Sequence, residues 1–248
     1  MKLFNLKQET LDATPVSEIV KRPTKDATDL TATVSAILND VREHGDSAVL
    51  EYEARFDKAR LASLQVTKAE FEAAEDEVDD ELREAIIKAR DNIAKFHEAQ
   101  RFGGIDVETD KGVRCWQRSV AIERVGLYIP GGTAPLFSTV LMLATPAAIA
   151  GCKDIVLCTP PRPDGTVHPA ILVAARIAGV NKVFKTGGVQ AIAAMAYGTE
   201  SIPKVSKIFG PGNQYVMAAK QQVSLGDVAI DMPAGPSEVC VVADATAN

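Results

Sequence analysis

The feature that most constrains the fold is a regular alternation of short apolar runs and longer apolar segments over the second half of the chain. The short runs have the length and composition of buried strands. The longer segments, rich in Ala, Ile, Leu and Val, exceed any hairpin turn and indicate helices. Strand, helix, strand at this spacing predicts parallel βαβ units. The expected strands are residues 124–129, 154–158, 182–184, 207–209, 228–230 and 238–242, and the expected helices are residues 137–150, 168–178, 189–196 and 214–223.

Because βαβ crossovers are almost always right-handed and cover the sheet on both sides, we predict an α/β fold with an open, Rossmann-like parallel sheet. A mostly helical region is expected before it. Residues 26–44 have helical spacing and Gly45 stands where a C-terminal cap belongs, while Thr67 and Glu70 form a capping box that begins a second helical region. An apolar stripe over residues 82–97 indicates a further helix with His97 at the edge of the core, and residues 113–120 alternate like a strand. The acidic run at residues 75–81 is expected to be a solvated helix face or a junction.

Composition excludes several classes of protein. Apolar residues make up 46% of the 248 positions and charged residues 24%, and no run approaches the roughly eighteen consecutive apolar residues of a membrane span. The N-terminus lacks the pattern of a signal peptide, so the cytoplasm is the expected compartment. A net charge of −6 argues against nucleic acid as a partner. The four cysteines lack C-x-x-C spacing and the three histidines are isolated, so we expect reduced thiols and no zinc site wholly within this chain.

Four loops that leave the expected strands carry the candidate binding residues, because ligands of an open parallel sheet bind beyond the carboxyl ends of its strands. Two are glycine-rich strand-to-helix turns, residues 128–133 and 186–190, and the second places Gln190 at a helix N-terminus. The third, residues 209–213, ends in Asn213. The fourth, residues 230–238, is an irregular loop that presents Asp231, Ser237 and Glu238.

Each loop taken alone has a structural alternative. A Gly-Gly turn can be plain connection geometry, and Asn213 can be a helix cap and nothing more. The sequence Gly-Pro-Gly-Asn lacks the third glycine of the dinucleotide-binding motif, since Tyr215 stands at that position. All four loops nevertheless fall on the same side of the expected sheet, which favours a shared binding site.

Three of these segments are long enough to carry a specific resemblance. Residues 123–140 read Glu-Arg-Val-Gly-Leu-Tyr-Ile-Pro-Gly-Gly-Thr-Ala-Pro-Leu-Phe-Ser-Thr-Val, residues 207–213 read Lys-Ile-Phe-Gly-Pro-Gly-Asn, and residues 231–239 read Asp-Met-Pro-Ala-Gly-Pro-Ser-Glu-Val. Together they resemble the histidinol dehydrogenase family, over the full length of the chain. The resemblance implies oxidation of L-histidinol to L-histidine by two successive hydride transfers to NAD, with zinc holding the substrate.

The resemblance also implies roles for particular residues. Tyr128, Gln190 and Asn213 match NAD-contacting positions of the family, and Ser237 matches a substrate-contacting one. In the family, the zinc ligands and a catalytic Glu-His pair lie at positions that correspond to a point beyond Asn248. No metal ligand or catalytic residue is therefore expected within this chain. We therefore expect the isolated chain to be inactive.

The family's architecture further implies a homodimer of intertwined subunits with an incomplete, aldehyde-dehydrogenase-like sheet. Residues 1–122 would contribute to a first, discontinuous α/β domain, residues 123–236 would form the Rossmann-like domain, and residues 237–248 would return to the first domain. Exposed apolar surface and self-association are expected to follow from the incomplete domain.

Two alternatives compete with this interpretation. An aldehyde dehydrogenase with a thiol nucleophile would use Cys240, but its apolar surroundings Val239 and Val241–Val242 favour a buried structural cysteine. A non-catalytic NAD-binding or assembly module derived from the same family would keep the loops and lack the chemistry.

Overall fold

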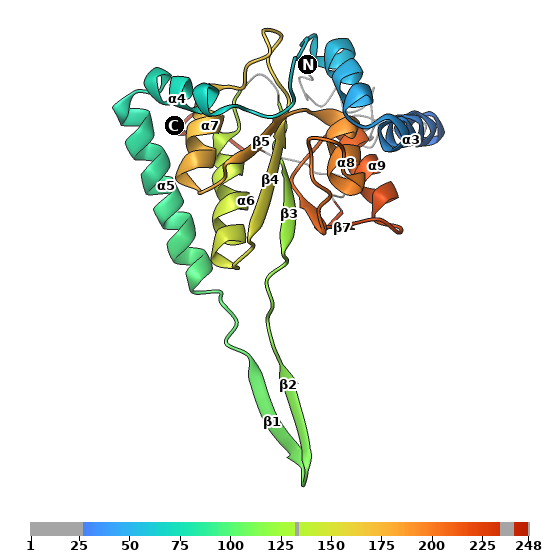
Figure 1. The fold of residues 1–248 in the computed structure, drawn as a ribbon. Helices are drawn as coiled ribbons and strands as arrows, with labels where there is room; N and C mark the ends of the chain where they lie inside the picture. The colour runs from blue at the N-terminus through green and yellow to red at the C-terminus, as the bar shows by residue number, and fades with distance from the viewer. Residues whose placement is uncertain (1–26, 132–133, 234–240, 248) are drawn as a thin grey trace, which may run out of the picture.

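In the computed structural model, residues 27–131, 134–233 and 241–247 are described (Figure 1). The N-terminal helices are α3 (Ala27–Tyr52), the π-helix η1 (Glu53–Asp57), α4 (Lys68–Glu77) and α5 (Asp80–Glu98). The strands are β1 (Ile105–Asp110), β2 (Val113–Gln117), β3 (Arg124–Tyr128), β4 (Asp154–Thr159), β5 (Lys182–Lys185), β6 (Lys207–Phe209) and β7 (Ala229–Ile230). The remaining helices are α6 (Phe137–Ile149), α7 (Pro169–Ile177), α8 (Gly188–Tyr197) and α9 (Gln214–Val223).

A five-stranded parallel sheet with the order β5-β4-β3-β6-β7 forms the centre of the molecule. Leu127 in the central strand β3 is paired with Leu157 of β4 on one side and with Phe209 of β6 on the other. The chain runs outward from β3 to β5, then returns to place β6 on the opposite side of β3. This is the doubly wound arrangement, and the α/β fold with a Rossmann-like parallel sheet is confirmed.

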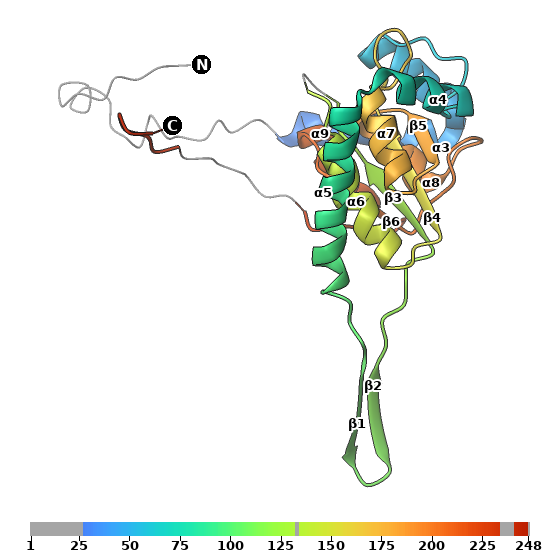
Figure 2. The same cartoon turned by 90° about the vertical axis from the view of Figure 1, so that its left-hand side faces the viewer.

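Helices cover both faces of the sheet, and each face has its own apolar core (Figures 1 and 2). On one face α8 and α9 pack beneath α3, and on the other α6 and α7 pack beneath α4 and α5. Helix α8 is buried all round from Val189 to Ala196 because the sheet lies on one side of it and α3 on the other. A helix without a polar face is stable only when it is enclosed in this way.

Gly45, where the sequence predicted a helix to end, has a non-helical backbone, and two helical segments of α3 meet there at a kink. Its φ of 54° is in the left-handed region that favours glycine, and the chain resumes helical geometry directly after it. A Cβ atom at this position would lie 2.3 Å from a carboxylate oxygen of Glu200, which accepts a hydrogen bond from the backbone N–H of Asp46 at 2.8 Å. Glycine therefore permits both the turn and the contact.

The junction between α4 and α5 agrees with the sequence analysis. The Thr67 hydroxyl accepts from the backbone N–H of Glu70 at 3.2 Å, and the Glu70 carboxylate accepts from the backbone N–H of Thr67 at 2.7 Å, which is the predicted capping box. The acidic run spans the break between the two helices, with Asp79 capping α5 through the N–H of Leu82. His97 is half-buried on α5, as expected at the edge of a core.

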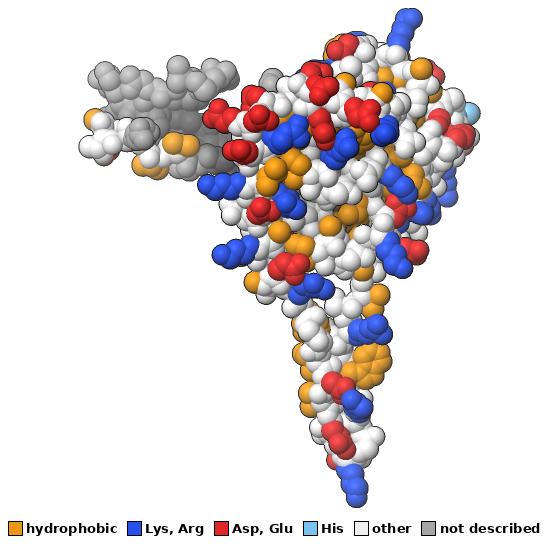
Figure 3. Space-filling model, turned by 60° about the vertical axis from the view of Figure 1, so that its left-hand side comes forward, with side chains coloured by type: hydrophobic (Ala, Val, Ile, Leu, Met, Phe, Trp, Pro, Cys, Tyr) orange, Lys and Arg blue, Asp and Glu red, His pale blue; other side chains and the backbone are white. Residues whose placement is uncertain are grey.

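An antiparallel hairpin, β1 with β2, projects away from the body of the molecule (Figures 1 and 2). The sequence predicted a strand at residues 113–120, and residues 113–117 form one, but it lies outside the parallel sheet and its partner β1 was missed. Every residue of both strands is exposed. Figure 3 shows apolar side chains interspersed with charged ones along this arm. The exposed large apolar residues of the arm and its base are Phe102, Ile105, Val107, Val113, Trp116 and Val120.

Two further expectations concern a membrane-spanning helix and the last strand of the sequence. Within the described ranges no helix is both long and apolar enough to cross a membrane. The strand expected at residues 238–242 lies mostly outside those ranges, and the two described members, Val241 and Val242, are exposed and not in a strand.

Candidate functional site

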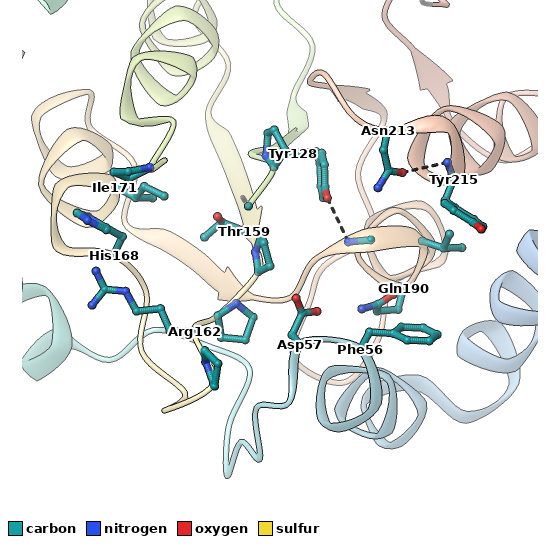
Figure 4. Close-up of a pocket in the computed structure, with 18 of the residues that line it drawn as sticks. Phe56, Asp57, Tyr128, Thr159, Arg162, His168, Ile171, Gln190, Asn213 and Tyr215 are labelled. Carbon is teal, nitrogen blue, oxygen red and sulfur yellow. Dashed lines mark hydrogen bonds between the residues drawn. The ribbon is translucent and has the colours of Figure 1, made fainter. Parts of the chain in front are cut away.

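A cavity of about 910 Å³ opens beyond the carboxyl ends of four parallel strands (Figure 4). It is bounded by the loops that follow β3, β4, β5 and β6 and by the end of the π-helix η1. The central position belongs to β3 and β6, whose following helices α6 and α9 cover opposite faces of the sheet. This divergence is the switch point at which doubly wound sheets bind their ligands. The polar side chains at the cavity are those of Thr33, Asp57, Tyr128, Thr159, Arg162, His168, Gln190, Asn213 and Tyr215.

Tyr128 ends β3 at the centre of the cavity wall. Its hydroxyl oxygen accepts a hydrogen bond from the backbone N–H of Gly188 at 3.1 Å, so it holds the first turn of α8 (Figure 4). The side chain is 4% exposed, and burial raises the pKa of its hydroxyl to about 12. Tyr128 is therefore a neutral group at physiological pH, and its hydroxyl proton remains available for a ligand.

Gln190 lies in the first turn of α8 and is held from behind by Glu53 of η1. Its amide nitrogen donates to Oε1 of Glu53 at 2.8 Å. The same oxygen accepts from the Thr186 hydroxyl at 2.7 Å and from the Gly187 N–H at 3.1 Å. Both carboxyl and amide groups are almost fully buried, so this cluster fixes the loop between β5 and α8.

Asn213 is the N-cap of α9 as well as part of the cavity wall. Its Oδ1 accepts from the N–H groups of Tyr215 at 3.0 Å and Val216 at 3.1 Å. Because the oxygen is used in this way, the amide nitrogen is the end that can donate to a ligand, and it lies on the cavity side in Figure 4. The capping role is observed, and it leaves the ligand-binding role open to the same side chain.

The loop between β6 and α9 is anchored by a second buried charge. Lys220 of α9 is 1% exposed, and its ammonium group donates to the carbonyl oxygen of Gly210 at 2.8 Å and pairs with Asp231. The other carboxylate oxygen of Asp231 accepts from the N–H of Gly210 at 2.9 Å. Both polar groups of the Gly210 backbone are thus held from the side away from the cavity.

Charged and titratable side chains also line the cavity. Asp57 faces it from η1, and burial raises the pKa of its carboxyl. His168 and Arg162 lie on the side of the cavity away from Asn213 and Tyr215 (Figure 4). Burial, with a contribution from the positive charge of Arg162, lowers the pKa of His168, whose Nδ1 accepts from the Ala170 N–H at 3.2 Å. That imidazole is accordingly a neutral cap of α7.

The structure brings Tyr128, Gln190 and Asn213 together at one cavity, although they are separated by up to 85 positions in sequence. Three of the four loops selected from the sequence line it. Ser237 and most of the fourth loop lie outside the described residues, as does Cys240. What each residue binds remains a prediction.

Sequence reasoning missed two parts of the wall. The loop after β4, from Thr159 to Pro163, follows a parallel strand just as the other loops do, and its three prolines were a usable signal. The segment with Phe56 and Asp57 belongs to the N-terminal helical region, and no local pattern indicates that it reaches the cavity. Its position depends on the packing of α3 against α8.

The described residues contain no group of three or more His, Cys, Asp or Glu side chains that could hold a metal ion. The expectation of a zinc site built from elsewhere is therefore neither supported nor contradicted by the geometry of this cavity.

Comparison with known proteins gives a consistent result. The family model described as histidinol dehydrogenase matches residues 20–248. The histidinol dehydrogenase of Bacteroides fragilis (strain ATCC 25285) is 70% identical over 237 residues, covering 96% of this chain and 55% of that protein. The enzyme of Escherichia coli K12 is 54% identical over 234 residues, covering 93% of this chain and 53% of that protein.

A solved structure shares the fold. The crystal structure of histidinol dehydrogenase from Elizabethkingia anophelis superposes with a TM-score of 0.85 at 52% identity, covering 95% of this chain and 55% of that one. The chain thus spans about half the length of the relatives it matches. With a family match over nearly its whole length, the chain belongs to the histidinol dehydrogenase family.

Proposed function

We propose that the protein to which these residues belong oxidises L-histidinol to L-histidine with NAD, as a step of histidine biosynthesis, and that the cavity at the switch point binds the NAD. The observation that carries the proposal is the convergence of Tyr128, Gln190 and Asn213 on one cavity. All three lie at or shortly after the carboxyl ends of strands of the parallel sheet, and all three match NAD-contacting positions of the family that the chain resembles. Family membership gives the reaction, and the cavity gives a place for the cofactor.

The residues of the cavity fit a dinucleotide in three respects. Helix α8 begins at the cavity with Gly187 and has no side-chain cap of its own, which leaves a partly positive helix end facing the site. Gly131 and Gly187 both pack against Pro160, where a Cβ would come within 2.4 Å and 2.6 Å of that ring. Glycine at both positions therefore lets the loops after β3, β4 and β5 come together at the cavity. The hydroxyl of Thr159 is buried at the cavity with no partner among the described residues.

In this proposal NAD supplies the hydride acceptor, and this chain supplies binding and orientation. Asn213 donates a hydrogen bond to the cofactor from its amide N–H, Tyr128 donates one from its hydroxyl, and Gln190 accepts one at its amide oxygen, because its NH₂ group is bound to Glu53. The apolar walls from Pro130, Pro160 and Val189 exclude water from the bound cofactor. Ser237 as a substrate contact remains part of the proposal and lies outside the described residues.

The described residues do not fit zinc, since they lack a suitable cluster of ligands. Zinc binding and the general base therefore belong, in this proposal, to parts of the protein outside the described residues, and no step is assigned to them here. The 248 residues alone are proposed to lack turnover. The relatives are nearly twice as long as this chain, which supports the proposal that zinc and the general base are held by other parts of the protein.

Homodimer formation and a cytoplasmic location complete the proposal. The exposed apolar side chains of the β1–β2 arm, including Trp116 at 69% exposure, support self-association. The cysteines Cys115, Cys152 and Cys158 are free, which agrees with a reducing compartment.

Calorimetric titration of the native-length protein with NAD tests the cofactor site. Asn213→Ser keeps a capping oxygen for α9 and removes the amide nitrogen, so it is expected to weaken NAD binding about tenfold, the equivalent of one hydrogen bond. Asn181→Ser is the matched control, because Asn181 is equally exposed but lies at the opposite end of the sheet, just before β5. Equal NAD affinity in both variants would contradict the proposed site.

The reaction is tested by NADH formation from L-histidinol. The native-length protein is expected to produce NADH, and the 248-residue chain is expected to produce none. NAD binding without any turnover by the native-length protein would instead support the non-catalytic module.

A further inference from the structure

Glu53 is the one carboxyl group of the described chain that is fully buried behind the candidate nucleotide loop. It lies in the π-helix η1 with 0% exposure, and its Oε1 accepts three hydrogen bonds from the segment Thr186–Gln190. These three donors are a hydroxyl, a backbone N–H and the side-chain amide of Gln190. The backbone N–H among these donors belongs to Gly187, which precedes the first turn of α8.

The other oxygen of Glu53 has a different environment. Oε2 is buried and receives no hydrogen bond from an N–H or O–H donor of the described residues, while the carboxylate of Asp57 can accept a hydrogen bond from Glu53 when Glu53 is protonated. A buried carboxylate with one oxygen unpaired is costly, and the group responds by holding its proton. Burial, together with the negative charge of Asp57, raises the pKa of Glu53 to about 7, although the hydrogen bonds from Gln190 and Thr186 favour the charged form.

The contact with Glu53 decides the orientation of the Gln190 amide. Because Oε1 of Glu53 also accepts from the Thr186 hydroxyl and the Gly187 N–H, it is an acceptor even when Oε2 carries a proton, so the NH₂ group of Gln190 is the end that faces it. The amide oxygen then lies on the other side, beside Gly188 and the cavity, 2.9 Å from where a Cβ of Gly188 would be. Gln190 therefore presents an acceptor to the cavity, and Glu53 is the reason.

We propose that Glu53 is a positioning residue of the nucleotide site, which fixes the Thr186–Gln190 loop and sets the Gln190 amide with its oxygen toward the cofactor. The inference rests on the proposed NAD site, and it goes beyond that site by naming a residue that touches no ligand. It also states the chemistry that Gln190 recognises, which is a hydrogen-bond donor such as a ribose hydroxyl or a carboxamide NH₂.

The titratable groups around Glu53 come from three elements. Asp57 lies one turn further along η1, Tyr128 lies on β3 and Cys158 on β4. Burial raises the pKa of Tyr128 to about 12, and burial also raises the pKa of the Cys158 thiol. Both groups therefore stay neutral where Glu53 titrates. Of these three groups Asp57 is the one that can share the titration of Glu53, and Asp57→Asn removes its charge.

The first experiment measures NAD affinity by calorimetry on the native-length protein. Glu53→Ala frees the Gln190 amide and is expected to weaken NAD binding about tenfold, whereas the isosteric Glu53→Gln keeps an acceptor oxygen and is expected to stay within about twofold of wild type. Glu51→Ala, at an exposed position of α3, is the control. Because Glu53 acts through Gln190, the double variant Glu53→Ala/Gln190→Ala is expected to bind no more weakly than Gln190→Ala alone.

The second experiment needs no nucleotide. In ¹⁵N-labelled protein the side-chain NH₂ resonances of Gln190, assigned with Gln190→Ala, are expected to shift with a midpoint near the titration of Glu53. They are expected to stay constant in Glu53→Gln and to retain a shift in Asp57→Asn. A purely structural glutamate would not couple this particular amide to pH.

The two experiments separate the inference from the function on which it rests. Absence of NAD binding by wild type, with the Gln190 amide still titrating, would remove the proposed cofactor and leave Glu53 as the group that orients Gln190. NAD binding that is equally strong in folded Glu53→Ala, or losses in the double variant that simply add, would overturn the inference while the cofactor site stands. Gln190 resonances that do not respond to pH in wild type would overturn it as well.

Discussion

Two loops at the same cavity are each held by a buried charge, and the two charges are compensated to different degrees. Lys220, behind the loop from β6 to α9, has the carboxylate of Asp231 and the carbonyl of Gly210 as partners. Glu53, behind the loop from β5 to α8, has three donors on one oxygen and, among the described residues, none on the other, and a second carboxyl, that of Asp57, is its neighbour. The first loop is held by an ion pair, and the second is held by a buried carboxyl group for which the described residues supply no cation.

The difference matters because a compensated charge is a structural element, while an uncompensated one responds to its surroundings. Removing the charge of Lys220 should leave Asp231 without its partner. Removing the charge of Glu53 while keeping its shape should relieve a desolvation cost whenever the group would be ionised. The two anchors are therefore expected to respond to charge removal with opposite signs, and the following variants test that contrast.

The largest effect is expected for Gly210→Ala, which distorts the loop that Lys220 holds. Gly210 has a φ of 139°, and a Cβ there would lie 2.2 Å from the carbonyl oxygen of Tyr128. A backbone atom cannot move aside as a side chain can, so clash and strained φ together should cost about 4 kcal/mol of unfolding free energy. Urea denaturation measures it. Gly226→Ala, where a Cβ meets nothing within 4 Å, should change stability by less than about 0.5 kcal/mol.

Lys220→Met tests the compensated anchor. It keeps the apolar stem and deletes the ammonium group, which leaves the Gly210 carbonyl unpaired and Asp231 uncompensated at 28% exposure. We expect a loss of about 3 kcal/mol by urea denaturation at neutral pH. Lys204→Met, at an exposed position, is the control and should be near neutral. A Lys220 variant as stable as wild type would show that the ion pair contributes nothing, and would remove one side of the comparison.

Glu53→Gln tests the uncompensated anchor through pH. In wild type the pKa of Glu53 is raised to about 7, so between its unfolded value and 7 the folded state binds more protons than the unfolded state. Stability from this group is therefore complete at acidic pH and is lost as pH rises toward 7 and above. We expect wild type to lose about 2 kcal/mol across this window, less than the full shift implies because Asp57 shares the titration.

Glu53→Gln should lack that decline in stability. At about pH 8 the variant should be more stable than wild type, whereas at about pH 5 the two should be similarly stable. Guanidinium denaturation at several pH values measures the difference. Glu51→Gln controls for the loss of one acidic residue on the same side of the chain, since Glu51 is exposed. A Glu53→Gln variant that is less stable than wild type at every pH would mean that Glu53 is compensated after all.

The comparison also marks how far the sequence alone could reach. Parallel strands were predictable because their apolar runs are separated by helices of fixed minimum length, and the residues at their carboxyl ends, Tyr128, Gln190 and Asn213, follow from that topology. Glu53 was not predictable, because its role depends on α3 packing across α8, a contact between segments about 135 positions apart. The hairpin arm was half-predicted, since alternation identifies a strand without identifying its partner.

The burial of the ion pair between Lys220 and Asp231 could not be predicted from the sequence either. Asp231 was noted in the sequence as a polar residue of a candidate site loop, yet its carboxylate faces Lys220 and the Gly210 backbone. A lysine in the middle of an amphipathic helix reads as solvent-exposed, and only the closeness of β7 to α9 turns it inward. Charges that are buried by tertiary contacts leave no local pattern.

The smallest expected effect concerns a single hydrogen bond to Glu53. Thr186→Val removes the hydroxyl that donates to Oε1 at 2.7 Å and keeps the shape of a fully buried side chain. The loss should be about 1 kcal/mol at pH 8, where the acceptor is charged, and smaller near pH 5, where it is neutral. Thr145→Val is a matched control, because the Thr145 hydroxyl is buried with no partner among the described residues, and its removal should be neutral or stabilising. A pH-independent loss at Thr186 would show that Glu53 keeps one charge state throughout, so the contrast between the two anchors would then rest on Lys220 alone.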